Sequence, residues 1–314
     1  MLARLQKIIT LSLLAAACVW GLAFWRVSPA LALGGGAVMV FGYAVLLALE
    51  FAALRRANRN DAAPPPRWGE LARAWAGECV AAARVFAWWQ PFRAAAVPDQ
   101  LVPDPARPGH RGVVLIHGFV CNRGLWTLWL RELERRGHVF AAVNLEPVFG
   151  SIDGYVPIID AAVRRVTQAT GLPPLLVCHS MGGLAARAWL RAVDGCARVH
   201  HVTTLGTPHH GTWLARCSRA ANGRQMRIGC DWQRQLEHDL PGRQRALFTC
   251  WYSNCDNIVF PASTATLAGA ENRLLRGRGH VRLALDATVL HDTLARLETV
   301  PPAGAPPESE RKSP

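Results

Sequence analysis

Ser180 stands at the junction between an apolar run and a pair of glycines. The apolar residues 175–178 predict a short buried strand, and residues 184–190 predict a helix of small and apolar side chains. A serine at such a turn is held in a strained backbone conformation that exposes its hydroxyl, an arrangement called a nucleophile elbow. Cys178 and Gly182 supply the small residues that the tight turn needs. The alternative is an ordinary turn with a helix-capping serine.

A serine is a weak nucleophile unless a base takes its proton and an acid orients that base. Asp256 follows the apolar run 247–252, where an acid after a late strand would stand, although aspartate is also common in turns. His280 follows two glycines after the last predicted strand, and we expect it to be the base. His291 falls within a predicted helix, and the turn directs His179 away from the serine hydroxyl.

An oxyanion formed on the substrate would need two hydrogen-bond donors. The N–H of Met181 is the first, and the N–H of Phe119, in the loop after the first core strand, is the second. We expect four nearby residues to line the substrate site: His117, Gly118, His209 and Trp213. Two adjacent histidines in the loop 206–212 could suggest a metal, but no carboxylate accompanies them. We therefore expect no metal and no cofactor.

The elements that must position these residues alternate between strand and helix. Strands are predicted at 112–116, 139–144, 175–178, 201–205, 247–252 and 273–275, and further helices at 125–136, 154–170 and 283–299. This alternation predicts an α/β domain over residues 111–300 with a parallel sheet covered on both faces. Residues 213–245 do not continue this alternation of strand and helix, and they mix apolar with charged side chains, which indicates a cap or lid insertion.

The N-terminal sixty residues contain two long apolar runs, 8–25 and 30–49, joined by a short connection. The first would span about 27 Å as a helix, close to the thickness of a bilayer core. We expect residues 1–60 to form a two-helix transmembrane anchor. Basic residues flank its outer ends, which places both ends and the catalytic domain on the cytoplasmic side of the inner membrane. A cleaved signal peptide ending near Cys18 is the alternative.

Residues 61–110 are predicted to form a proline-rich linker and a helix over 68–92, which could lie at the membrane interface or pack on the catalytic domain. Residues 301–314 are expected to be disordered. The net charge of +13 comes mostly from arginine, yet no nucleic-acid-binding motif appears. We expect no nucleic acid partner, and anionic lipid is a secondary possibility. The nine cysteines include no C-x-x-C pair, and we expect reduced thiols.

Taken together, these motifs resemble the bacterial lipase/esterase branch of the α/β-hydrolases. The resemblance spans about 112–299 and implies an α/β-hydrolase fold, a mostly parallel central sheet flanked by helices. It also implies carboxylic ester hydrolysis by Ser180, His280 and Asp256. This chain departs from the pattern at Cys178, where a glycine is usual, and in its membrane runs, which the secreted lipases lack. The matching segments are His117-Gly118-Phe119, 178–183, 206–212, Asp256 with Val259 and Pro261, and Gly279-His280.

The expected function is that of a membrane-anchored serine hydrolase acting on lipid-like esters, with the membrane as a partner. The same residues could serve a thioesterase, or an acyltransferase if an alcohol outcompetes water. A noncatalytic membrane binding module is a third possibility, which the intact serine, acid and base disfavour.

Overall fold

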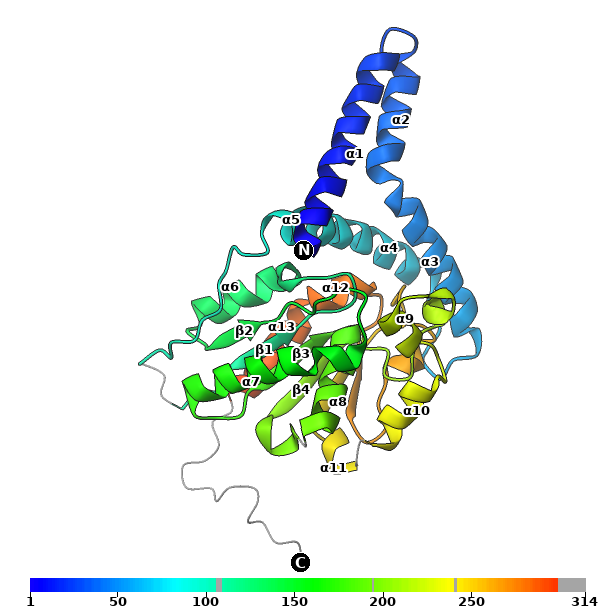
Figure 1. Ribbon diagram of the computed structural model, residues 1–314. Helices are drawn as coiled ribbons and strands as arrows, with labels where there is room; N and C mark the ends of the chain where they lie inside the picture. The colour runs from blue at the N-terminus through cyan, green and yellow to red at the C-terminus, as the bar shows by residue number, and fades with distance from the viewer. Residues whose placement is uncertain (106–108, 194, 240–241, 299–314) are drawn as a thin grey trace, which may run out of the picture.

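The computed structural model describes residues 1–105, 109–193, 195–239 and 242–298. Its centre is a sheet of six strands in the order β2-β1-β3-β4-β5-β6, and every neighbouring pair is parallel (Figure 1). The strand bounds are β1 (Val113–Ile116), β2 (Phe140–Ala142), β3 (Leu175–His179), β4 (His201–Leu205), β5 (Phe248–Tyr252) and β6 (Glu271–Leu274). The predicted parallel α/β sheet is confirmed.

Successive strand residues point to opposite faces of the sheet, and in β1 both sets are apolar. Helices therefore cover both faces. Val114 and Ile116 of β1 pack in a core with helices α7 (Val156–Thr170) and α8 (Met181–Val193). Their neighbours Val113 and Leu115 pack in a second core with α6 (Thr127–Arg135) and α13 (Ala287–Glu298). Both cores are needed to bury strands that are apolar on both faces.

One segment differs from its predicted form. The closing helix predicted over 283–299 is two helices, α12 (His280–Ala284) and α13, so His280 begins a short helix instead of lying in a loop. The described parts of the predicted insertion, 213–239 and 242–245, contain short helices, of which α9 contacts η4 and α10 contacts α8. Their role as a lid stays a prediction. The short elements are η3 (Arg123–Trp126), η4 (Ile152–Tyr155), η5 (Gly195–Arg198), η6 (Trp213–Cys217), α9 (Ala221–Gln225), α10 (Asp231–His238), α11 (Gly242–Arg245) and η7 (Ala262–Ala265).

The N-terminal region forms a helical hairpin that projects from the sheet domain (Figure 1). It consists of α1 (Leu2–Phe24) and α2 (Pro29–Phe41), and the chain then continues into α3 (Tyr43–Ala57) and η1 (Asn58–Asn60). Within the described residues, only α1 is a single helix that is long and apolar enough to cross a membrane. The second predicted span is not one helix: α2 and the helical segment up to Asn60 pass the same test only when they are taken together as one bent pair. A second span therefore stays a prediction.

The second apolar run bends by 53° between α2 and α3, around Gly42. A side chain at Gly42 would come within 2.5 Å of the carbonyl oxygen of Val38, so the tight backbone there requires glycine. Beyond the bend, Phe51 and Leu54 are buried in a cluster that includes Phe260 of the sheet domain. Hydropathy alone cannot reveal the bend, because the apolar run continues through it.

The predicted helix 68–92 is a continuous helical run that includes a stretch of π-helix. Its parts are α4 (Trp68–Ala82), η2 (Ala83–Trp89) and α5 (Gln90–Phe92). The inner face of α4 buries Leu71, Ala74 and Glu78, whereas Trp68 is 71% exposed on the outer face. The helix thus packs on the catalytic domain and also presents aromatic surface to its surroundings. The predicted tail 301–314 lies outside the described residues.

Candidate active site

Ser180 has the backbone geometry that its sequence context predicts. It stands between β3 and α8 with a φ of 55°, a left-handed conformation that is rare and strained for residues other than glycine. A side chain at position 182 would lie 2.4 Å from the carbonyl oxygen of Ile116, and one at position 183 would collide with Thr207. Gly182 and Gly183 therefore let the elbow pack against the ends of neighbouring strands.

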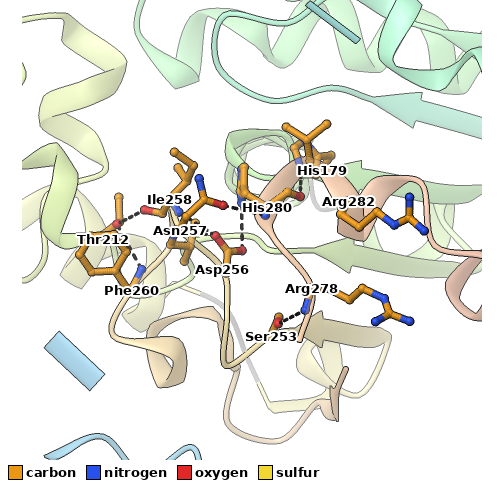
Figure 2. A network of polar contacts seen from close by, with 12 residues as sticks. His179, Thr212, Ser253, Asp256, Asn257, Ile258, Phe260, Arg278, His280 and Arg282 are labelled. Carbon is orange, nitrogen blue, oxygen red and sulfur yellow. Dashed lines mark hydrogen bonds and ion pairs between the residues drawn. The ribbon is translucent and has the colours of Figure 1, made fainter. Parts of the chain in front are cut away.

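Asp256 and His280 form a buried pair in the segments that follow β5 and β6 (Figure 2). His280 Nδ1 lies 2.9 Å from Asp256 Oδ2. The other carboxylate oxygen accepts hydrogen bonds from the backbone N–H groups of Ile258 and Val259, at 3.0 and 2.8 Å. With both oxygens engaged, the carboxylate has a fixed orientation toward the imidazole.

The end of β4 connects this pair to the serine. The carbonyl oxygen of Leu205 accepts a hydrogen bond from the N–H of Ser180 at 2.9 Å. At the next residue, Gly206, a Cβ would lie 2.7 Å from Asp256 Oδ2 and 3.1 Å from His280 Nδ1. The three residues predicted to carry out catalysis are thus gathered at the C-terminal edge of one parallel sheet.

Charge around His280 counteracts the effect of its burial. Burial alone would lower the pKa of His280, but the carboxylates of Asp256, Glu78 and Glu50 raise it above the ordinary value. A base with a raised pKa is a stronger proton acceptor once it is neutral.

His179 supports the base from the residue next to the serine. Its Nε2 lies 3.1 Å from the carbonyl oxygen of His280, and the two ring centroids are 4.5 Å apart. Because a carbonyl only accepts, His179 Nε2 must carry the proton. Burial, with a smaller contribution from His280, holds the pKa of His179 well below its usual value. His179 is thus a neutral side chain that fixes the His280 backbone.

Two glutamates that the sequence reasoning missed also hold the His280 segment. Glu78 of α4 accepts hydrogen bonds from the N–H groups of Val281 and Arg282. Glu50 of α3 accepts one from Asn257 Nδ2 at 2.6 Å, and Asn257 Oδ1 accepts the N–H of His280 at 3.1 Å. One sequence signal was available, because Glu78 interrupts the apolar face that α4 buries.

The loop after β1 packs against the elbow, as expected for an oxyanion loop. A Cβ on Gly118 would lie 2.7 Å from the Cβ of Ser180. The ring of His117 uses both nitrogens within the protein, since Nδ1 donates to the Gly118 carbonyl at 2.9 Å and Nε2 accepts the N–H of Leu145 at 3.0 Å. Burial lowers the pKa of His117 to about 4. His117 therefore shapes this loop, and its nitrogens are not available to bind a substrate.

The first turns of α1 contact the same loop. Gln6 Nε2 donates to Gln90 Oε1 at 3.0 Å and approaches the Val120 carbonyl at 3.4 Å. Asn122 Nδ2 lies 3.4 Å from Gln6 Oε1, and its backbone N–H donates to Gln90 Oε1 at 3.1 Å. The N-terminal end of the candidate membrane helix is therefore fixed to the loop that carries Phe119.

The other two predicted substrate residues lie in different places. His209 is 1% exposed and points into the core, where Nε2 lies 3.1 Å from Thr204 Oγ1. Trp213 is partly exposed and packs against Phe260, with the Arg216 guanidinium 3.5 Å from its ring centroid. A substrate contact stays a prediction for both residues. In the part of the chain that the structure describes, no three histidine, cysteine or acidic side chains gather as a metal site.

No protein-family model matches the chain. Among solved structures, the mature form of Bacillus licheniformis lipase BlEst2 superposes with a TM-score of 0.55 at 18% identity, covering 64% of this chain and 96% of that chain. Aspergillus fumigatus lipase B superposes with a TM-score of 0.54 at 18% identity, covering 65% of this chain and 55% of the lipase. Together with the parallel sheet and the strained serine, these likenesses show that the chain has the α/β-hydrolase fold.

Proposed function

We propose that this protein is a membrane-anchored serine hydrolase that cleaves carboxylic esters of lipid-like substrates. The observation that carries the proposal is the buried Asp256–His280 pair, with its 2.9 Å contact, at the sheet edge where Ser180 occupies a strained elbow. Two unrelated features, a strained serine and an oriented base, coincide there. The names of the structural neighbours, which are lipases, are consistent with this activity.

The reaction follows from the orientation of His280. Its Nδ1–H donates to Asp256, which leaves Nε2 as the acceptor for the Ser180 proton. The serine oxygen then attacks the ester carbonyl, and the N–H groups of Phe119 and Met181 stabilise the resulting oxyanion. His280 returns the proton to the leaving alcohol, which departs as the acyl-enzyme forms. Water, deprotonated by His280, hydrolyses the acyl-enzyme and restores Ser180.

The exposed apolar hairpin supports membrane attachment. α1 has 23 residues, about 34 Å of helix, and leaves large side chains such as Leu11, Val19 and Leu22 exposed. The N-terminal end of α1 packs against α5, and α2 continues into α3, which packs on the sheet domain, so the tip of the hairpin points away from that domain (Figure 1). With the basic residues Arg55 and Arg56 in the last turn of α3, this geometry favours a catalytic domain on the cytoplasmic face of the inner membrane. An enzyme held there would meet esters that reside in the bilayer.

A substrate panel on the full-length protein in detergent micelles tests this function. Nitrophenyl esters of graded acyl length should be hydrolysed by the wild type, whereas Ser180→Ala should lose at least about 10³-fold in kcat. The matched control is Ser151→Ala, which removes an exposed hydroxyl that caps η4 and accepts a hydrogen bond from Gln225, with circular dichroism to confirm the fold. Thioester substrates and competing alcohol acceptors, with product analysis, would reveal a thioesterase or an acyltransferase. Equal activity of the wild type and Ser180→Ala would refute the proposal.

A further inference from the structure

We propose that Glu78 is a positioning residue for catalysis, which holds the backbone that carries His280 from a helix outside the hydrolase core. This inference rests on the proposed function, because it assigns His280 as the base. Glu78 lies in α4, the helix that precedes the sheet domain in the sequence, about two hundred positions before the residues it contacts.

The contacts of Glu78 engage both carboxylate oxygens. Oε1 accepts the N–H of Val281 at 2.7 Å, and Oε2 accepts the N–H of Arg282 at 3.0 Å. The preceding N–H, that of His280, is accepted by Asn257. Three consecutive backbone N–H groups are thus fixed by side chains from elsewhere. Because the imidazole is attached to this backbone, these bonds determine where the ring lies relative to Asp256 and Ser180.

The local sequence is adapted to this contact. Glu78 is 1% exposed, and a Cβ on Gly279 would lie 2.4 Å from Glu78 Oε2 and 2.8 Å from Glu78 Cβ. Gly279 has an ordinary extended conformation, so the turn itself does not require glycine. What requires glycine at this position is the close approach of the glutamate.

A buried carboxylate costs free energy unless it is hydrogen-bonded or paired with charge. Burial raises the pKa of Glu78 to about 7, even though its two backbone hydrogen bonds and the nearby His280 favour the ionised form. Asp256 opposes ionisation, and Glu50 reaches the same segment through Asn257. An ionised Glu78 also favours the positive charge that His280 acquires during acylation. If Glu78 only capped the helix, its hydrogen bonds alone would matter. If it acts on the catalytic base, its charge should also raise the pKa of His280.

The test compares Glu78→Gln with the wild type in the full-length, detergent-solubilised protein. Glutamine keeps the shape but offers only one acceptor oxygen to the two N–H groups, so the His280 segment should shift. We expect kcat to fall about 10- to 100-fold, as small misplacements of a catalytic group do. The acidic limb of the kcat/KM profile should move to lower pH, since His280 loses a nearby negative charge. Glu134→Gln, which removes an exposed carboxylate, should change neither property.

A second readout keeps the inference separate from the proposed function. NMR titration of ¹³C-labelled histidines, with the His280 signal assigned from its loss in His280→Gln, measures the pKa of His280 without any substrate. If the wild type hydrolyses no ester, the proposed function is wrong, but a lower His280 pKa in Glu78→Gln would still support the contact. An unchanged His280 pKa together with an unchanged pH profile would overturn the inference.

A second variant, Glu78→Asp, tests the same contact if Glu78→Gln does not fold. Aspartate keeps the charge but is one methylene too short to reach both N–H groups. We expect kcat to fall about tenfold, with the His280 pKa close to that of the wild type. Wild-type kcat in Glu78→Asp would show that the reach of the carboxylate does not matter, which contradicts a positioning role.

Discussion

Replacing Asp256 by asparagine tests the orientation of the proposed base. Asp256 Oδ1 accepts two backbone N–H groups, and Oδ2 faces His280 Nδ1. Asparagine can satisfy the two N–H groups only by placing its single oxygen there, which turns its NH₂ group toward His280. A donor now faces Nδ1, so the ring must carry its proton on Nε2. In that tautomer His280 cannot accept the proton of Ser180.

The magnitude follows from these hydrogen bonds. Two backbone hydrogen bonds stabilise the unproductive orientation by about 1–3 kcal/mol in total, a factor of about 5 to 150. The lost charge-assisted bond to the imidazolium adds about 1.5–3 kcal/mol. Together these losses amount to about 2.5–6 kcal/mol, so we expect kcat to fall about 10²- to 10⁴-fold, with about 10³-fold as the central value. Because the backbone hydrogen bonds survive, the unfolding temperature should change by only about 2–4 °C.

The assay is the initial rate of ester hydrolysis by full-length protein, with circular dichroism to confirm the fold. Asp231→Asn is the matched control, because the same change occurs at a side chain that is 96% exposed, and its kcat should equal that of the wild type. If Asp256→Asn keeps kcat within about threefold of the wild type while remaining folded, Asp256 does not orient the base and the reasoning fails.

Three further outcomes are expected. Gly182→Ala should cost about 2–4 kcal/mol of unfolding free energy, because its Cβ would lie 2.4 Å from a β1 carbonyl oxygen. The control Gly77→Ala, in open space on α4, should be neutral or stabilising. Equal urea unfolding midpoints for the two variants would contradict this expectation. Leu54→Ala should cost about 2–5 kcal/mol of unfolding free energy, because the side chain is fully buried. Leu49→Ala, on the same helix but 62% exposed, should cost little. A similar loss of unfolding free energy in both variants would disprove the docking of α3. Since His280 must be neutral to act as base and its pKa is raised, kcat/KM should reach half its maximum above pH 6.5, and a midpoint below that value would argue against the carboxylates around it.

Much of the sheet could be predicted from the sequence because it depends on local patterns. The apolar runs that became β1, β3 and β4 are buried on both faces, and their bounds lie within a residue of those predicted. Asp256 and His280 could be chosen because parallel strands end at the same edge. The buried contact between the two residues was therefore expected from their order along the chain, and their catalytic roles remain proposals.

The remaining features depend on contacts between distant segments. The bend at Gly42 precedes the part of α3 that docks on the sheet domain, and no hydropathy pattern records either feature. Glu78 contacts Val281 across about two hundred residues of sequence. His209 follows a strand as a pocket residue would, yet the chain turns its ring into the core. A single sequence shows which residue types are present, but not which way a loop presents them.

The most direct test of the central claim is the site at which a fluorophosphonate probe forms a covalent adduct. After the full-length protein reacts with the probe and is digested, mass spectrometry identifies the modified peptide. The proposed mechanism predicts one adduct, on Ser180, which forms at least about 10³-fold more slowly in His280→Ala. An adduct on a different serine, or none on the folded wild-type protein across neutral and alkaline pH, would contradict it.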